Sequence, residues 1–167
     1  MKPKRGLQHF NSDIVNCNLK ELQYHLSLSI MEQRDICIWG NPSIDKPSIV
    51  KDFLKYSTIK FIEINCPDFD KKRFEEEVNA LNNEAGNNET VVILLHEITK
   101  TNESLSDFFE NLISKRIIEN QLLAKNWFFI ITNSNLLTDN VSTSISILQS
   151  SVIHINYVPD DCWIEEQ

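Results

Sequence analysis

The chain has 167 residues, a formal net charge of -8 and 41% hydrophobic residues, with only three glycines and five prolines. This length suits one domain that buries a proper core, and the acidic balance argues against a nucleic-acid backbone or an anionic membrane as the main partner. The sequence shows neither an apolar run of about 18 residues that would span a membrane nor the apolar stretch of a signal peptide at its polar start. We therefore expect a cytoplasmic protein of one domain.

Helices and strands are predicted to alternate along the chain. Leucine and isoleucine at helical spacing after Asn18 predict a first helix, with Asn18 as its cap and Glu21 completing a capping box. Apolar runs predict strands at residues 36–39, 60–65, 91–95, 128–131 and 152–157. Helical spacing predicts further helices from residue 47 to about residue 56 and at residues 70–81, 105–113 and 141–148.

This alternation predicts an α/β three-layer sandwich with a mainly parallel five-stranded sheet, in which ligands bind at the carboxyl ends of the strands. We expect residues 1–17 to be an N-terminal extension and residues 18–167 to be the α/β core domain. The four cysteines, Cys17, Cys37, Cys66 and Cys162, are far apart and no histidine stands at metal-ligand spacing from them. They are predicted to be reduced and structural, and no metal site is expected.

The segment between the strand at residues 36–39 and the following helix is the main candidate for chemistry. Gly40-Asn41-Pro42-Ser43-Ile44-Asp45-Lys46-Pro47 has the length and the lysine of a P-loop, G-x-x-x-x-G-K-[ST]. However, Asp45 stands at the second glycine and Pro47 at the hydroxyl residue that would coordinate Mg²⁺. The Asp45 carboxylate can accept N–H groups of the first helical turn, such as that of Ser48, which a phosphate would otherwise take. An ordinary capped turn between strand and helix is the simpler interpretation of this segment taken alone.

Several motifs, in their order and spacing, resemble those of the AAA+ ATPases, and most closely the MoxR-like branch, over residues 18–166. Residues 38–51 look like the Walker A stretch and residues 92–98 look like Walker B, an apolar strand that ends in Asp-Glu. Residues 116–127 are similar to the turn before the sensor-1 strand, and residues 148–163 are similar to the region around the last strand. The resemblance implies a P-loop NTPase-like fold.

Position by position, the resemblance carries over little of the family's chemistry. It places the phosphate-binding lysine at Lys46 and the Walker B glutamate at Glu97. His96 replaces the aspartate that would help to hold Mg²⁺, and a neutral imidazole is a poor ligand for a hard cation.

The two remaining positions also depart from the pattern. By strict count the sensor-1 asparagine falls on Ser134, with Asn133 and Asn135 on either side. Ser151 stands in for the arginine finger, whose loss costs on the order of 10³–10⁵ in rate.

The resemblance thus implies a degenerate, catalytically inactive domain, in which the positions that match family sites are vestigial. At the catalytic positions these are Glu97, His96, Ser134 and Ser151, and in the phosphate loop they are Gly40, Asn41, Pro42, Asp45, Lys46, Pro47 and Ser48. No cofactor and no metal are expected, with weak binding of ATP and Mg²⁺ as the alternative.

The expected role is that of a protein-interaction or regulatory subunit, a monomer or part of a hetero-oligomer, whose partner is an active AAA+ ATPase. No membrane partner and no direct nucleic-acid binding are expected. A weakly active ATPase and a clamp-loader-like accessory subunit in DNA replication are the alternatives. Because the chain ends soon after its last predicted strand, we expect the family's C-terminal helical lid to be absent.

Histidine and tryptophan offer other candidate sites. His96 and Glu97 could act as an acid and base pair, but adjacent residues at a strand end point to opposite faces, which argues against a shared substrate. His154 is predicted to be a hydrogen-bonded core histidine. We expect core or rim positions for the three tryptophans because no basic residues alternate with them, and these are Trp39, Trp127 and Trp163.

Overall fold

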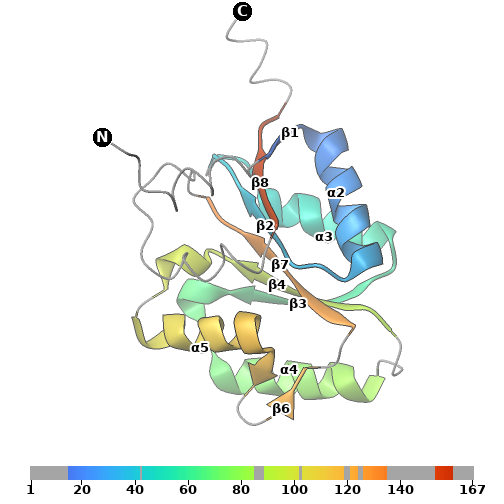
Figure 1. Ribbon diagram of the computed structural model, residues 1–167. Coiled ribbons are helices and arrows are strands. Elements are labelled where there is room, and N and C mark those ends of the chain that lie inside the picture. The colour runs from blue at the N-terminus through green and yellow to red at the C-terminus, as the bar shows by residue number, and fades with distance from the viewer. Residues whose placement is uncertain are drawn as a thin grey trace, which may run out of the picture.

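A parallel sheet of six strands lies at the centre of the molecule (Figure 1). The computed structural model describes residues 15–41, 43–84, 89–101, 103–118, 121–123, 126–134 and 153–159. The strands of the sheet are β1 (Val15–Cys17), β2 (Ile36–Trp39), β3 (Lys60–Asn65), β4 (Val91–His96), β7 (Trp127–Thr132) and β8 (Ile153–Tyr157). Their order is β1-β8-β2-β7-β4-β3, and every neighbouring pair is parallel.

The helices form a layer on each face of this sheet. They are α2 (Leu19–Glu32), α3 (Lys46–Tyr56), α4 (Lys71–Glu84) and α5 (Glu103–Lys115), with short 3₁₀ helices η1 (Cys66–Asp68) and η2 (Ile98–Lys100) after β3 and β4. Figure 1 shows α2 and α3 on one face and α4 and α5 on the other. A small antiparallel pair, β5 (Ile117–Ile118) and β6 (Gln121–Leu122), follows α5.

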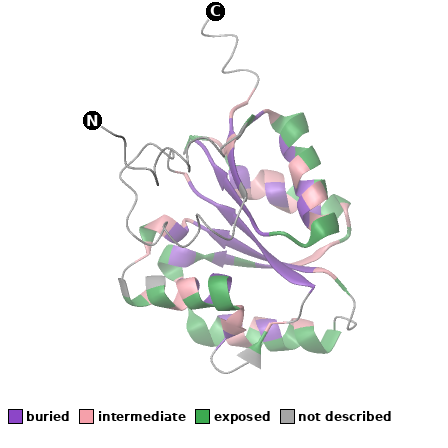
Figure 2. Cartoon of the chain, viewed as in Figure 1, coloured by how far each residue is buried: buried purple, intermediate pink, exposed green. Residues whose placement is uncertain are grey.

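Side chains that alternate along the central strands fill two cores. In β4, Val92 and Leu94 pack with the residues of α2 and α3, whereas Ile93 and Leu95 pack with those of α4 and α5. Every residue of β4 and of its neighbour β7 is buried, and the middle of the sheet is accordingly purple in Figure 2. Burial on both faces is what a parallel sheet covered by two helical layers requires.

The structure confirms the predicted sandwich and the predicted positions of the five strands. The predicted number of strands in the sheet was wrong, because the sheet contains one more. β1, at the end of the segment expected to be an extension, pairs with β8, so the sheet has six strands and not five. Its three residues are too few to show an alternating pattern, and Asn16 in the middle is polar. The strand forms because the edge of β8 offers partners, including the side-chain amide of Asn156, which donates to Oδ1 of Asn16 at 3.0 Å.

The first helix begins at the predicted capping box. Oδ1 of Asn18 accepts the N–H of Glu21 at 2.9 Å, and the Glu21 carboxylate accepts the N–H of Asn18 at 3.4 Å, which completes the capping box. The helix predicted at residues 141–148 lies outside the described residues. Among the helices that are described, none is long and apolar enough to cross a membrane.

Candidate functional site

The loop that follows β2 begins at Gly40, which lies close to the backbone of the neighbouring strand β8. A Cβ atom on Gly40 would lie 2.9 Å from the carbonyl oxygen of Tyr157, which ends β8. Only glycine fits so close to a neighbouring backbone atom. The first position of the predicted loop is therefore needed for the packing of the sheet, whether or not the loop binds a ligand.

The ammonium group of Lys46 is folded back onto its own loop. Its Nζ donates to the carbonyl oxygens of Gly40 and Asn41, at 3.2 and 3.0 Å, and the side chain is only 2% exposed. Burial lowers the pKa of Lys46, while the negative charge of Glu97 acts in the opposite direction. The lysine that would contact phosphate in a working loop is thus bound by the loop itself.

Backbone N–H groups of the loop also have partners within the loop. Oδ1 of Asn41 accepts the N–H and the hydroxyl of Ser43, at 2.9 and 3.0 Å. The N–H of Ile44 donates to the carbonyl oxygen of Asn41 at 3.1 Å, and the N–H of Lys46 donates to that of Ile44 at 2.9 Å. A phosphate cradle needs these donors aimed at the ligand, and here three of them are aimed at loop oxygens.

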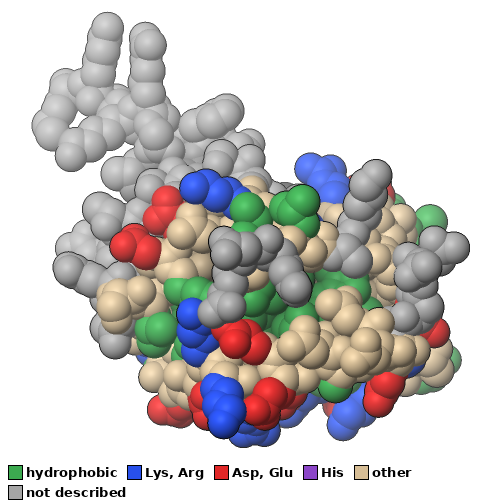
Figure 3. Space-filling view, turned by 90° about the horizontal axis from the view of Figure 1, so that it is seen from below, with side chains coloured by type: hydrophobic (Ala, Val, Ile, Leu, Met, Phe, Trp, Pro, Cys, Tyr) green, Lys and Arg blue, Asp and Glu red, His purple; other side chains and the backbone are tan. Residues whose placement is uncertain are grey.

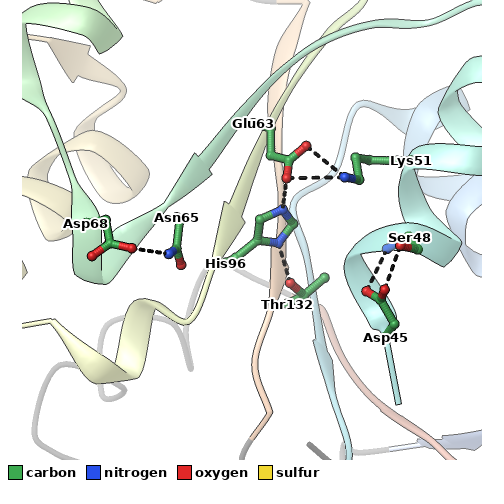
Figure 4. A network of polar contacts seen from close by, with 8 residues as sticks. All are labelled: Asp45, Ser48, Lys51, Glu63, Asn65, Asp68, His96 and Thr132. Atoms are coloured by element: carbon green, nitrogen blue, oxygen red, sulfur yellow. Dashed lines mark hydrogen bonds and ion pairs between the residues drawn. The ribbon is translucent and has the colours of Figure 1, made fainter. Parts of the chain in front are cut away.

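Asp45 caps α3, as predicted. Its Oδ1 accepts the N–H of Ser48 at 3.2 Å, and its Oδ2 accepts the Ser48 hydroxyl at 2.7 Å (Figure 4). These two hydrogen bonds hold the pKa of Asp45 below its ordinary value. A carboxylate and its bonded serine therefore occupy the helix N-terminus, where an anion would otherwise bind.

His96, at the end of β4, belongs to a chain of polar contacts that joins four elements (Figure 4). Its Nδ1 lies 2.6 Å from the hydroxyl of Thr132 in β7, and its Nε2 lies 3.4 Å from Oε1 of Glu63 in β3. The other Glu63 oxygen lies 3.2 Å from Nζ of Lys51 in α3. Burial lowers the pKa of His96, although the Glu63 carboxylate acts to raise it. Both ring nitrogens thus face protein groups.

Glu97 contacts a different set of groups from those of His96. The hydroxyl of Ser134 donates to Oε2 of Glu97 at 2.8 Å, and the ammonium of Lys100 lies 3.3 Å from the same oxygen. Lys100 also donates to the Ser134 hydroxyl at 3.0 Å. The backbone of Glu97 is left-handed, with φ 59°, which turns the chain out of the strand. His96 and Glu97 share no partner in these contacts, as the argument against an acid and base pair predicts.

The structure places the residue predicted at the sensor-1 position, Ser134, close to Glu97. Ser134 is the residue beside Glu97, whereas Asn133 is fully buried and directs its Nδ2 to the sulfur of Cys37 at 3.3 Å. Asn133 therefore points into the core and away from Glu97. The other predicted positions Pro42, Asn135 and Ser151 lie outside the described residues.

The described residues do not fit a nucleotide with its metal ion. The loop donors face loop oxygens, the helix N-terminus carries the Asp45 carboxylate, and Pro47 has no hydroxyl to offer Mg²⁺. Throughout the described ranges, no group of three or more His, Cys, Asp or Glu side chains could hold a metal ion. The arrangement fixes the loop and the strand ends to one another.

The structure confirms that His154 is a hydrogen-bonded core histidine and that two of the tryptophans are core residues. The indole N–H of Trp39 donates to Nδ1 of His154 at 2.9 Å, and the two residues are 0% and 5% exposed. Trp127 is buried in β7, and Trp163 lies outside the described residues. Three of the cysteines are buried and form no disulfide, namely Cys17, Cys37 and Cys66. Burial raises the pKa of the Cys17 thiol to about 11, while Cys162 is not described.

Four site residues were missed by reasoning from the sequence, and these are Lys51, Glu63, Lys100 and Thr132. Thr132 carried a usable signal, because it ends an apolar run as His96 does, and parallel register places the two side by side. Glu63 could also have been found, because it is the one acidic residue of its predicted strand. Lys51 and Lys100 gave no local signal, since exposed lysines are common on helices.

Comparison with known proteins identifies the fold and the family. Among solved structures, the RuvB Holliday junction branch migration motor of Thermotoga maritima is similar with a TM-score of 0.55 and 14% identity, over 84% of this chain and 44% of that chain. A variant of the same RuvB gives a TM-score of 0.56 with 15% identity, over 83% of this chain and 43% of that one. Our chain thus spans less than half the length of these structures, and at this identity they show the fold alone. A search of curated proteins finds no match.

The family model that matches is "ATPase family associated with various cellular activities (AAA)", over residues 36–153. This match runs from the start of β2 to the start of β8, and so it includes the loop, Glu97 and the sensor-1 position. A match over most of the chain, together with the parallel sheet and the lysine loop after β2, shows that this chain belongs to the AAA family.

Proposed function

We propose that this chain is a catalytically inactive AAA domain that acts by binding a protein partner. The observation that carries the proposal is the closed state of the loop after β2, in which Lys46 and three backbone N–H groups bind loop oxygens. Phosphate binding would require these contacts to break and Asp45 to leave the N-terminus of α3. Both steps cost free energy before any contact with the ligand forms.

The altered positions affect separate parts of catalysis, and their effects on the rate of hydrolysis therefore add to one another. Asp45 adds a negative charge where phosphates would lie, and Pro47 and His96 remove oxygen ligands for the metal. Glu97, which would polarise the attacking water, is held by Ser134 and Lys100. In addition, Ser151 supplies no cation for the transition state.

A domain that keeps the AAA fold also keeps the surfaces through which such domains pack. We infer a regulatory or interaction subunit of the cytoplasm that works beside an active AAA+ ATPase, as a monomer or in a hetero-oligomer. The motif order over residues 38–51 and 92–98 supports the MoxR-like branch as its source.

Calorimetric titration with ATP and with ADP, each in the presence of Mg²⁺, tests the proposal. We expect no binding in the micromolar range. Replacing Asp45 by glycine and Pro47 by serine together should raise the affinity roughly tenfold, because the change removes a like charge and exposes the helix N-terminus. Micromolar affinity of the parent chain, or a double variant that binds no better than the parent, would overturn our account of the loop.

A weakly active ATPase is the second candidate, and the retention of both Lys46 and Glu97 favours it. That function predicts a slow hydrolysis of ATP that either Lys46→Ala or Glu97→Gln abolishes. Turnover that persists unchanged in both variants would belong to a contaminant and would leave the inactive domain as the explanation.

A further inference from the structure

The strand β3 forms an open edge of the sheet. In the part of the chain that is described, it pairs with β4 on one side and with no strand on the other. It has six residues, whereas β1 at the opposite edge has three. An open edge presents a row of backbone N–H and C=O groups that another extended chain can pair with. β3 is thus the longer of the two edges on which a strand could be added.

A groove of about 640 Å³ lies between this edge and α4. Its wall on the β3 side includes Ile62 and Ile64, and the far wall includes Leu81 of α4. At the end near η1 it meets Phe69, whose ring lies 5.7 Å from that of Phe74 and 5.0 Å from that of Phe109. Phe69 and Leu81 are only partly buried. The groove therefore offers apolar surface directly beside unpaired backbone.

Acidic side chains surround this apolar surface. Three carboxylates line the groove against a single cation, Arg73, and the three are Asp68, Asp70 and Glu77. Glu63 of β3 also borders the groove, but its carboxylate is paired with Lys51 of α3. Nε of Arg73 lies 3.2 Å from Oε1 of Glu77, so that one positive charge is already engaged. Asp68 accepts a hydrogen bond from the neutral amide of Asn65 at 2.7 Å. The groove as a whole is negative, as is the chain with its net charge of -8.

Figure 3 shows the side of the molecule that lies at the bottom of Figure 1, where α4 and α5 are found. Hydrophobic side chains are visible there in a hollow with acidic and basic side chains around it.

We propose that β3 and the groove beside it bind an extended, basic segment of a partner protein, which adds a seventh strand to the sheet. Alternate side chains of such a segment would face opposite sides of the sheet. On the face that covers the groove, apolar residues would lie beside Phe69 and Leu81, and lysine or arginine residues on the same face would meet the carboxylates. Backbone pairing supplies affinity in this mode of recognition, and side chains supply specificity.

This inference rests on the proposed function, because both assign a protein partner to the chain. It adds the surface and the chemistry of the partner segment. The two can fail separately, since nucleotide titration reports on the loop after β2 and peptide binding reports on β3.

The test is fluorescence anisotropy with the labelled peptide Lys-Thr-Val-Thr-Ile-Thr-Lys, in which the apolar and basic residues share one face, at low and at high salt. Two control peptides have glutamate in place of lysine, or the same residues in blocks that do not alternate. We expect the alternating basic peptide to bind, more weakly at high salt, and both controls to bind at least tenfold more weakly. Backbone amide shifts in a ¹H–¹⁵N spectrum should change at residues 60–65 and along α4.

Adjacent residues of α4 provide matched protein variants. Glu77→Gln removes a carboxylate that lines the groove and should weaken binding roughly two- to fivefold. Glu76→Gln, an exposed position outside the groove, should leave binding unchanged. Equal binding of the acidic peptide, equal effects of the two substitutions, or amide shifts confined to the loop after β2 would each overturn the proposal. Absence of binding by all three peptides would overturn it as well, whatever the nucleotide titration gives.

Discussion

Lys46 shows how one residue can be kept while its contacts change. In a working P-loop this side chain reaches the phosphates of the nucleotide. Here it bonds two carbonyl oxygens of the loop and is buried. We propose that Lys46 contributes to the stability of the loop after β2.

We therefore predict that Lys46→Ala lowers the free energy of unfolding by about 1–3 kcal/mol, the usual range for hydrogen bonds that involve a charged group. Urea denaturation of the parent and the variant measures this difference in the free energy of unfolding. Lys55→Ala, at an exposed position of the same helix, is the control and should change stability by less than about 0.5 kcal/mol. A fully stable Lys46→Ala variant that loses affinity for ATP would instead assign the lysine to nucleotide binding.

His96 should make stability depend on pH. Because burial lowers its pKa below the ordinary value of 6.5, the unfolded chain binds a proton more readily than the folded chain as pH falls. The contribution of His96 to stability is complete above about pH 6.5 and is lost as pH falls through its folded pKa. Unfolding free energies measured between about pH 7 and pH 5 should therefore decline more steeply in the parent than in His96→Gln. Parallel curves for the two proteins would contradict this assignment.

At the scale of the element, α3 begins with a cap that serves the helix and blocks an anion. Asp45 satisfies the N–H and the hydroxyl of Ser48, and its negative charge lies at the positive end of the helix dipole. The same carboxylate can hardly share this place with a phosphate.

Asp45→Ala is predicted to lower the melting temperature, because the N–H of Ser48 loses its partner, whereas Asp45→Asn should keep most of the stability since asparagine is also a good cap. Thermal denaturation followed by circular dichroism gives both values. If alanine and asparagine have equal effects, the hydrogen bond to Ser48 contributes nothing and the cap is not what holds this helix start.

Elements were more predictable from the sequence than the contacts between them. The capping box of Asn18 and Glu21 and the apolar run at residues 91–95 are local patterns, and each gave its element correctly. β1 was missed because its only signal is the open edge of a strand far away in the sequence. The contact of His96 with Glu63 depends on the register of two parallel strands, which periodicity alone does not fix.

At the scale of the whole molecule, the two ends of the parallel sheet have different roles. The carboxyl ends carry the loop, His96 and Glu97, and ligands of open α/β sheets bind at this end of the strands. At the amino ends, a buried carboxylate joins separate parts of the fold. Oδ1 of Asp35, just before β2, accepts the N–H of Phe129 in β7 at 2.8 Å, and its Oδ2 lies 3.4 Å from the guanidinium of Arg116 after α5.

Asp35 is thus expected to matter for the stability of the whole domain and not for the loop. Burial raises its pKa, while the bonds from Phe129 and Arg116 act to lower it. Asp35→Ala leaves the buried N–H of Phe129 without its acceptor and should cost about 1–3 kcal/mol of unfolding free energy.

Arg116→Ala removes only a partly exposed partner, which also lies over the Phe129 ring at 5.5 Å, and should cost less than Asp35→Ala. Chemical denaturation of the two single variants and the double variant measures the coupling. A loss in Asp35→Ala no larger than that in Arg116→Ala would mean that the ion pair, and not the bond to the β7 backbone, is what Asp35 contributes to the fold.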